Sequence, residues 1–198
     1  MRNYYLSSFK AAIDAGVLSI MNAFTTYINL PVTMNKYLLD DLLRKECGFT
    51  GPVVSDWQCL RHLLNFKMVE SDEEAALVGL QSGIDIDLNG KVYSRYLLEV
   101  IKENPPLIEL LDKAVWRVLK MKEKMGLFQN PLPKKNPKPL SLEIRKHAQK
   151  AADEAIILFK NEDNILPLPQ EAKILVIGAY NDDQDIHLGA WSSRGLKE

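Results

Sequence analysis

An aspartate at the end of an apolar run is the first residue whose position could support chemistry. Asp56 follows Val53 and Val54 and directly precedes Trp57. In α/β barrels, side chains at the carboxyl ends of the strands form the active site. A carboxylate beside an indole suits carbohydrate chemistry, because the ring stacks on apolar sugar C–H groups while the carboxylate attacks or stabilises the anomeric centre. The alternative is that Asp56 caps the next helix.

Two further aspartates alternate with apolar residues later in the chain. Asp85 and Asp87 lie within the run Ile84–Leu88, so in a strand both carboxylates would face the same side. On neighbouring strands, Asp56 and Asp87 could be the paired carboxylates of a glycosidase, which stand about 5–9 Å apart. We favour the alternative that Asp85 and Asp87 hydrogen-bond to nearby strand and loop groups.

The sequence predicts neither a metal site nor a cofactor site. A short loop near the C-terminal end gathers potential ligands, Asp182, Asp183, Asp185 and His187. Short acidic loops are usually solvated turns, so we expect no metal there. Cys47 and Cys59 lack a nearby histidine pattern and are expected to be free structural thiols. The chain also has no glycine-rich phosphate loop.

The elements that must position Asp56 alternate between strand-like and helix-like segments. Apolar runs at 17–24, 51–57 and 84–88 predict three strands. Helices are expected between them, one starting at Asn35 and ending at Gly48, the other running from Ser71 to Gly83. This alternation is typical of a parallel α/β sheet.

The second part of the chain begins with two more predicted helices, at about 92–103 and 107–125. The latter carries a helical-spaced apolar stripe that predicts core packing: Leu111, Val115, Val118, Met121 and Met125. Residues 129–140 hold four prolines and three lysines but no acidic residue, which is typical of an extended linker. Ser141 is then expected to cap a helix to about Asn161, and residues 173–178 to form a strand of another α/β unit.

Composition excludes several classes of function. The 198 residues include 25 Lys and Arg against 26 Asp and Glu, for a formal net charge of −1. We therefore expect no nucleic-acid partner and no attraction to an anionic membrane. No apolar run approaches the roughly 18 residues that a membrane-spanning helix needs. Two cysteines exclude a disulfide framework.

Several ordered motifs make the sequence resemble glycoside hydrolase family 3, in particular its β-glucosidase branch. They extend over essentially the whole chain: Pro31–Leu39, Leu42–Arg44, Gly48–Trp57, Ser82–Asp87, Met125–Phe128, Ala155–Asn161, Leu166–Leu168 and Leu188–Ser192. The resemblance implies a retaining, exo-acting glycosidase that removes terminal β-linked glucosyl residues without metal or organic cofactor. Its substrate would be a β-glucoside or an oligosaccharide.

The resemblance also implies a role for four residues. Asp56 matches the nucleophile of the family, and Trp57 matches the aromatic residue that borders its sugar sites. Met21 would line the substrate pocket. Phe24 falls where many relatives have tyrosine, so a phenolic hydrogen bond near the nucleophile would be missing.

The fold implied by the resemblance is incomplete. Residues 1–128 would be the C-terminal part of a (β/α)8 TIM-like barrel, 129–140 a Pro/Lys linker, and 141–198 the start of an α/β sandwich domain. A complete barrel needs about 250 residues, so three strands cannot close one, and the remainder of the same protein would be its partner. The general acid would come from the second domain, beyond Glu198.

This incompleteness bears on activity and on compartment. We expect these residues alone to be inactive, and the alternative function is a non-catalytic remnant or a carbohydrate-binding fragment. Relatives are often periplasmic or secreted, but the residues themselves specify no compartment.

Overall fold

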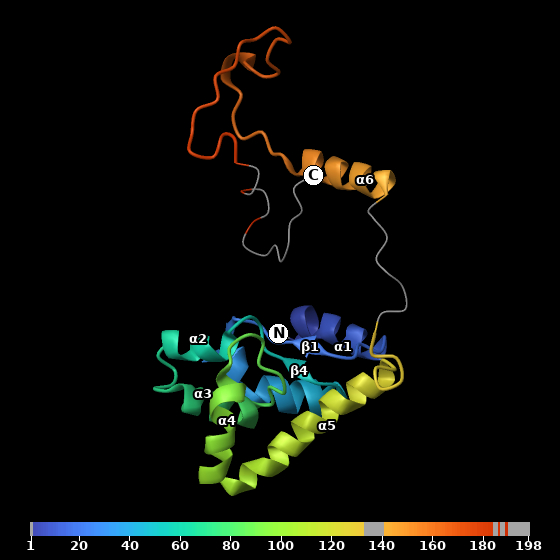
Figure 1. Cartoon of the computed structure of the whole chain (residues 1–198), viewed down its shortest axis with the longest axis vertical. Helices are drawn as coiled ribbons and strands as arrows, with labels where there is room; N and C mark the ends of the chain where they lie inside the picture. Colours follow the sequence, from blue (N-terminus) through green and yellow to red (C-terminus); the bar gives the residue numbers. More distant parts are fainter. Residues whose placement is uncertain (1, 133–140, 184–185, 187–188, 190–198) are drawn as a thin grey trace. The chain divides into compact units, whose positions relative to one another are not determined.

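The computed structural model describes residues 2–132, 141–183, 186 and 189. The chain divides into two compact units, Met1–Asn136 and Pro137–Glu198. Figure 1 shows the helices and strands of the first unit gathered around β1 and β4. Each unit is described by itself below.

The centre of the first unit is a short parallel sheet. Strand β1 (Ile20–Met21) pairs with β4 (Val53–Val54), so that Ile20 lies opposite Val53 and Met21 opposite Val54. Val54 also forms a parallel bridge with Ile86. The three predicted strand segments therefore lie side by side in the order β1, β4 and the segment around Ile86. Together they form a mixed α/β structure in which the barrel is not closed.

The predicted strand at 17–24 is shorter than expected and is followed by a hairpin. Strands β2 (Thr26–Tyr27) and β3 (Leu30–Pro31) pair in antiparallel fashion. The two residues between them have positive φ angles, 51° at Ile28 and 60° at Asn29. Positive φ at both central positions is typical of a tight hairpin turn, and the sequence lacks the glycine that usually signals it.

Helices cover one side of this sheet. The first unit contains η1 (Arg2–Leu6), α1 (Ser7–Asp14), η2 (Val32–Met34), η3 (Tyr37–Glu46), α2 (Cys59–Asn65), α3 (Asp72–Ser82), α4 (Val92–Glu103), η4 (Pro105–Leu107) and α5 (Ile108–Lys124). The predicted caps are confirmed: Asn35 Oδ1 accepts the N–H of Leu38 at 3.1 Å, and Ser71 Oγ accepts that of Glu74 at 3.1 Å. Gly83 ends α3 with φ +107°, a conformation that favours glycine.

The core forms two clusters of buried side chains. One joins α2, α3 and α4 and includes Leu60, Leu63, Ala75, Leu80, Val92 and Val100. The other lies between η3 and the sheet and consists of Ile20, Leu39, Leu43, Phe49, Val53 and Ile84. The side chains of Ile20 and Val53 point into this second cluster. Because side chains alternate along a strand, Met21, the next residue of β1, faces the opposite side of the sheet, where it is 54% exposed.

The prediction that the apolar stripe of α5 packs in the core is wrong for part of the helix. Val115 and Met125 are 46% and 54% exposed, whereas Ala114 is the buried residue of this helix. The apolar spacing indicates a face that needs a cover, and the described residues bury only part of it. Helical periodicity alone does not say what provides that cover.

The second unit begins with α6 (Leu142–Ala155), capped as predicted by Ser141, whose Oγ accepts the N–H of Ile144 at 3.3 Å. The helix ends at Ala155, so the prediction that it reaches Asn161 is wrong. A short turn, η5 (Glu162–Asn164), follows. Residues 133–140 of the predicted linker lie outside the described residues, and the second domain stays a prediction.

The predicted strand at 173–178 is not formed in the part of the chain that the structure describes. Its apolar side chains, Ile174, Leu175, Val176 and Ile177, are 62–83% exposed. A strand is stable only when a neighbour accepts its backbone hydrogen bonds, and none of the described residues of this unit does so.

No described helix has both the length and the apolar character to cross a membrane.

Candidate active site

Asp56 lies at the carboxyl end of β4, where the sheet leaves one face open. Burial alternates along this segment: Val53 and Ser55 are fully buried, while Val54 and Asp56 are half-buried. Because Met21 lies opposite Val54, the strands place Met21, Val54 and Asp56 on the open face. The structure therefore brings two of the four predicted site residues, Asp56 and Met21, to neighbouring strands.

The Asp56 carboxylate is held by the turn that follows it. Its Oδ1 accepts the N–H of Trp57 at 2.6 Å, and the backbone carbonyl of Asp56 accepts the N–H of Cys59 at 3.0 Å. The residue before α2 is Gln58, which has φ +53° and makes no side-chain cap. The carboxylate of Asp56 thus does not cap α2, contrary to the alternative that the sequence left open.

A layer of buried polar side chains lies behind Asp56, and the sequence motifs did not predict it. Asn22 Oδ1 accepts the N–H of Asp56 at 2.9 Å, and Asn22 Nδ2 donates to Thr33 Oγ1 at 2.9 Å. The Thr33 hydroxyl and the Cys59 thiol lie 2.8 Å apart. The local indication in the sequence is that Asn22, a polar residue, lies within the apolar run 17–24 on the buried side of the strand. Burial raises the pKa of the Cys59 thiol, so it remains protonated at neutral pH.

The two predicted aromatic site residues are partly exposed. Trp57 is 42% exposed and Phe24 is 37% exposed. The Phe24 ring lies 5.1 Å from that of His62 on α2, which in turn meets Phe66 edge-on at 6.2 Å. Phe24 therefore packs against α2, and both Phe24 and Trp57 keep part of their aromatic surface exposed.

Asp85 and Asp87 have structural partners, as the favoured alternative predicted. The buried Asp85 carboxylate accepts from Arg44 Nη2 at 2.6 Å, from Arg117 Nη1 at 2.8 Å and from the N–H of Val53 at 2.8 Å. Asp87 Oδ2 accepts the N–H of Val92 at 2.7 Å and so caps α4. Both carboxylates thus make hydrogen bonds that hold neighbouring strand and helix groups in place.

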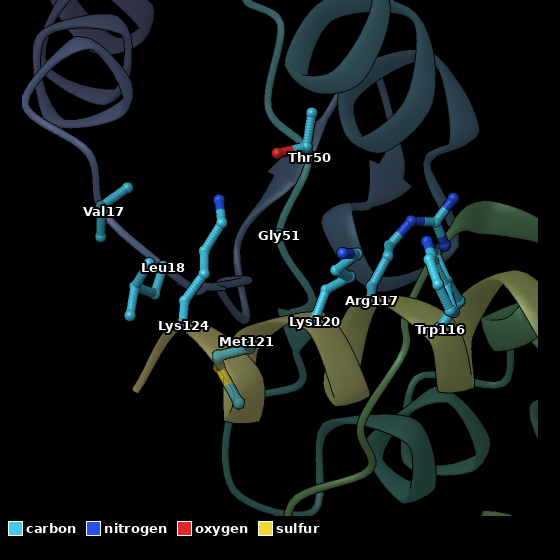
Figure 2. Close-up of a pocket in the computed structure, with 9 residues that line it drawn as sticks. All are labelled: Val17, Leu18, Thr50, Gly51, Trp116, Arg117, Lys120, Met121 and Lys124. Carbon is cyan, nitrogen blue, oxygen red and sulfur yellow. The ribbon is translucent and has the colours of Figure 1, made fainter. Parts of the chain in front are cut away.

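A cavity of about 310 Å³ lies at the other end of the sheet (Figure 2). It opens between α5 and the segments that precede β1 and β4, and is lined by Val17, Leu18, Thr50, Gly51, Trp116, Arg117, Lys120, Met121 and Lys124. Two of its three cations already have partners: Arg117 pairs with Asp85, and Lys120 with Glu123 at 3.0 Å. Since the cavity lies at the amino ends of the strands, it does not belong to the site around Asp56.

The described residues contain no group of three His, Cys, Asp or Glu side chains arranged to hold a metal ion. In the acidic loop singled out above, Asp185 and His187 lie outside the described residues. Cys47 and Cys59 are both free and buried, as predicted.

Comparison with known proteins defines the class. Residues 1–121 match the family model of the glycosyl hydrolase family 3 N-terminal domain, so the chain belongs to glycoside hydrolase family 3. The match confirms the resemblance drawn from the motifs around Asp56. The structure is a mixed α/β part of that domain, and its barrel is open.

Particular relatives are β-glucosidases and β-xylosidases. The chain is 35% identical to the periplasmic β-glucosidase of Salmonella typhimurium over 98% of its own length and 26% of that protein. It is 37% identical to a β-xylosidase of Formosa agariphila, covering 85% and 25% of the two chains. The structure of β-glucosidase from Listeria innocua in complex with glucose matches with a TM-score of 0.68 and 36% identity, covering 85% and 24%. The chain thus spans about a quarter of the length of these relatives.

Proposed function

We propose that this chain supplies the nucleophile of a retaining β-glucosidase and that Asp56 is that nucleophile. The observation that carries the proposal is the placement of Asp56 at the carboxyl end of β4, on the open face of the sheet, in a member of glycoside hydrolase family 3. With Oδ1 engaged by the N–H of Trp57, we assign attack to Oδ2.

The reaction would proceed by two displacements. Asp56 Oδ2 forms a bond to the anomeric carbon as the bond to the leaving-group oxygen breaks, and a general acid gives that oxygen a proton. Water then attacks the glycosyl-enzyme, and the same acid residue, now a base, takes the proton from the water. We expect this acid/base residue to come from the second domain, beyond residue 198.

Two neighbours of Asp56 would contact the sugar. Trp57 presents part of its indole to solvent, which suits stacking on apolar C–H groups. Met21 lies on the neighbouring strand, where its thioether would line the wall of the sugar site. Phe24 lies against α2 and would add an apolar border without the hydroxyl of a tyrosine.

The proposed substrate class is a terminal β-linked glucosyl residue. It is supported by relatives named as β-glucosidases and by a solved relative in complex with glucose. A xylosyl residue is the competing substrate, since other relatives are named as β-xylosidases. Because the chain spans about a quarter of these proteins, a non-catalytic, sugar-binding role is the second candidate function.

The test traps the covalent glycosyl-enzyme intermediate in the full-length protein to which these residues belong. A 2-deoxy-2-fluoro-β-glucoside with a dinitrophenyl leaving group needs no general acid, so it reports on the nucleophile alone. We expect one fluoroglucosyl group on Asp56 by peptide mass spectrometry and none in Asp56→Asn. Asp41→Asn, which removes an exposed partner of Lys45, serves as the matched control and should label normally.

A second variant tests the same assignment by rescue. Asp56→Gly should lose turnover of an aryl β-glucoside by a factor of at least 10³ and regain part of it with azide. The product should be the α-glycosyl azide, because a single displacement inverts the anomeric centre. Turnover in Asp56→Gly equal to the unaltered protein would exclude Asp56 as nucleophile. Binding of the glucoside without any labelling would favour the non-catalytic function.

A further inference from the structure

We propose that Asn22 is a positioning residue that fixes Asp56 from the buried side of the sheet, a role that rests on the proposed function of Asp56. The Asn22 N–H donates to the carbonyl of Val54 at 2.9 Å, as a parallel ladder requires. In a regular ladder, the next bond would run from the N–H of Asp56 to the backbone carbonyl of Asn22. Here the side-chain Oδ1 of Asn22 accepts that N–H instead, at 2.9 Å.

This substitution of a side chain for a backbone group ends the pairing of β1 and β4 at Asp56. The backbone after Asn22 is then free to leave the sheet toward the β2–β3 hairpin. The N–H of Asp56 nevertheless keeps a partner, so the residue remains anchored while its side chain faces the open side. A ladder that ended without the Asn22 side chain would leave this N–H without a protein partner.

The orientation of the Asn22 amide is determined by its partners. Only the oxygen can accept the N–H of Asp56, so Nδ2 points toward Thr33 Oγ1, 2.9 Å away. Thr33 Oγ1 in turn lies 2.8 Å from the sulfur of Cys59. Asn22, Thr33 and Cys59 are 4%, 1% and 2% exposed. Breaking any of these bonds would leave a buried polar group unpaired, so the network holds Asn22 in one rotamer.

The network ties together both ends of the turn that carries the carboxylate. Asn22 holds the N–H of Asp56, and Cys59, which begins α2, donates its own N–H to the carbonyl of Asp56 at 3.0 Å. The three side chains come from the residue directly after β1, from η2 and from α2, so three parts of the chain converge beneath one aspartate. Because all three are buried on the side facing the helices, none touches a sugar on the open face.

Such support matters for a nucleophile because the rate depends steeply on its position. A misplacement of about 1 Å can cost a factor of about 10² in rate. Loss of the anchor should therefore reduce the rate of attack while leaving sugar affinity nearly unchanged. It should also expose the N–H of Asp56 to exchange with water.

The experiment compares Asn22→Leu with Asn35→Leu. Both side chains are buried asparagines, 4% and 5% exposed, and Asn35 caps η3 without contacting Asp56. In Asn22→Leu we expect labelling by the fluoroglucoside to slow 10- to 100-fold at saturation, with its half-saturating concentration unchanged. Hydrogen exchange at the Asp56 amide should become about tenfold faster. Asn35→Leu should show neither change, whatever its loss in melting temperature.

Thr33 provides a second variant in case Asn22→Leu fails to fold. Thr33→Val keeps the shape but removes the hydroxyl that holds Nδ2, so both readouts should move in the same direction by a smaller factor. Thr33→Ser restores the hydroxyl and should restore both. Unchanged exchange at Asp56 in Asn22→Leu and Thr33→Val, or slowed labelling in Asn35→Leu equal to that in Asn22→Leu, would overturn the proposal.

The two readouts separate this inference from the proposed function. If the unaltered protein is not labelled at Asp56, the nucleophile assignment fails. Amide exchange at Asp56 then still decides whether Asn22 anchors it. If labelling occurs and exchange does not respond to Asn22→Leu, the nucleophile assignment stands and the anchoring role of Asn22 fails.

Discussion

Asp56, Asp85 and Asp87 all lie in or just after apolar strand-like runs, yet their carboxylates meet different surroundings. Asp56 faces the open side of the sheet and contacts the following N–H. Asp87 caps α4, and Asp85 is buried between two guanidinium groups. Their partners differ because each side of the sheet meets different elements.

The Asp85 network allows a prediction of stability. The side chain of Asp85 is 1% exposed, and those of its partners Arg44 and Arg117 are 9% and 24% exposed. Asp85→Asn removes the counter-charge and leaves two cations facing one another in a poorly solvated site. We expect the free energy of unfolding to fall by about 3–5 kcal/mol, measured by urea denaturation.

An exposed ion pair provides the control for Asp85. Glu99 pairs with Lys102 on α4, and its side chain is 62% exposed. Glu99→Gln should change the free energy of unfolding by no more than about 0.5 kcal/mol, because solvent screens the pair. Equal losses in Asp85→Asn and Glu99→Gln would mean that the buried network contributes no more than a surface pair.

At the scale of elements, the contact between β1 and β4 depends on a glycine that precedes β4. A Cβ atom added at Gly51 would lie 2.1 Å from the backbone oxygen of Leu18, in the segment that leads into β1. Backbone atoms cannot move aside as a flexible side chain can. The close approach of the two strands at this point therefore requires the absence of a side chain.

Gly51→Ala should separate β1 from β4 and lower the free energy of unfolding by about 2–3 kcal/mol. Gly48→Ala is the matched variant, since a Cβ there meets nothing within 4 Å but the residue has φ +75°. Its cost should be about 1 kcal/mol, from backbone strain alone. Chemical denaturation of both variants measures the difference, and a smaller loss at Gly51 than at Gly48 would contradict the clash.

At the scale of the whole molecule, the first unit leaves one face of its sheet and part of α5 uncovered. Met21, Trp57, Val115 and Met125 are 42–54% exposed. Parallel sheets in α/β proteins are normally buried on both faces. Within the described residues, β1 pairs with β4 alone, so its other edge can accept a further strand.

We therefore expect the 198-residue chain, purified by itself, to bind a hydrophobic dye and to self-associate as its concentration rises. Light scattering and dye fluorescence measure both effects. Met21→Gln should reduce dye binding, whereas Leu98→Gln, at a 65% exposed position on α4, should not. A monodisperse monomer that binds no dye would show that the open face is covered in solution.

Local patterns were sufficient to predict several features of this protein. The caps at Asn35, Ser71 and Ser141, and the order of strands and helices, follow from interactions within a few residues. The position of Asp56 at a strand end follows from the apolar run before it, and the family motifs around it agree with the comparison. Cap chemistry and strand ends were predictable because neighbours in sequence decide them.

Partners distant in sequence were decided by tertiary structure alone. The anchoring of Asp56 by Asn22 joins residues 34 positions apart, and the pairing of Asp85 with Arg44 joins residues 41 apart. The segment 173–178 has the composition of a strand but forms none among the described residues. Spacing fixes which side chains share a face of one element. The packing of several elements fixes what that face meets, and so which aspartate is left on the open side of the sheet.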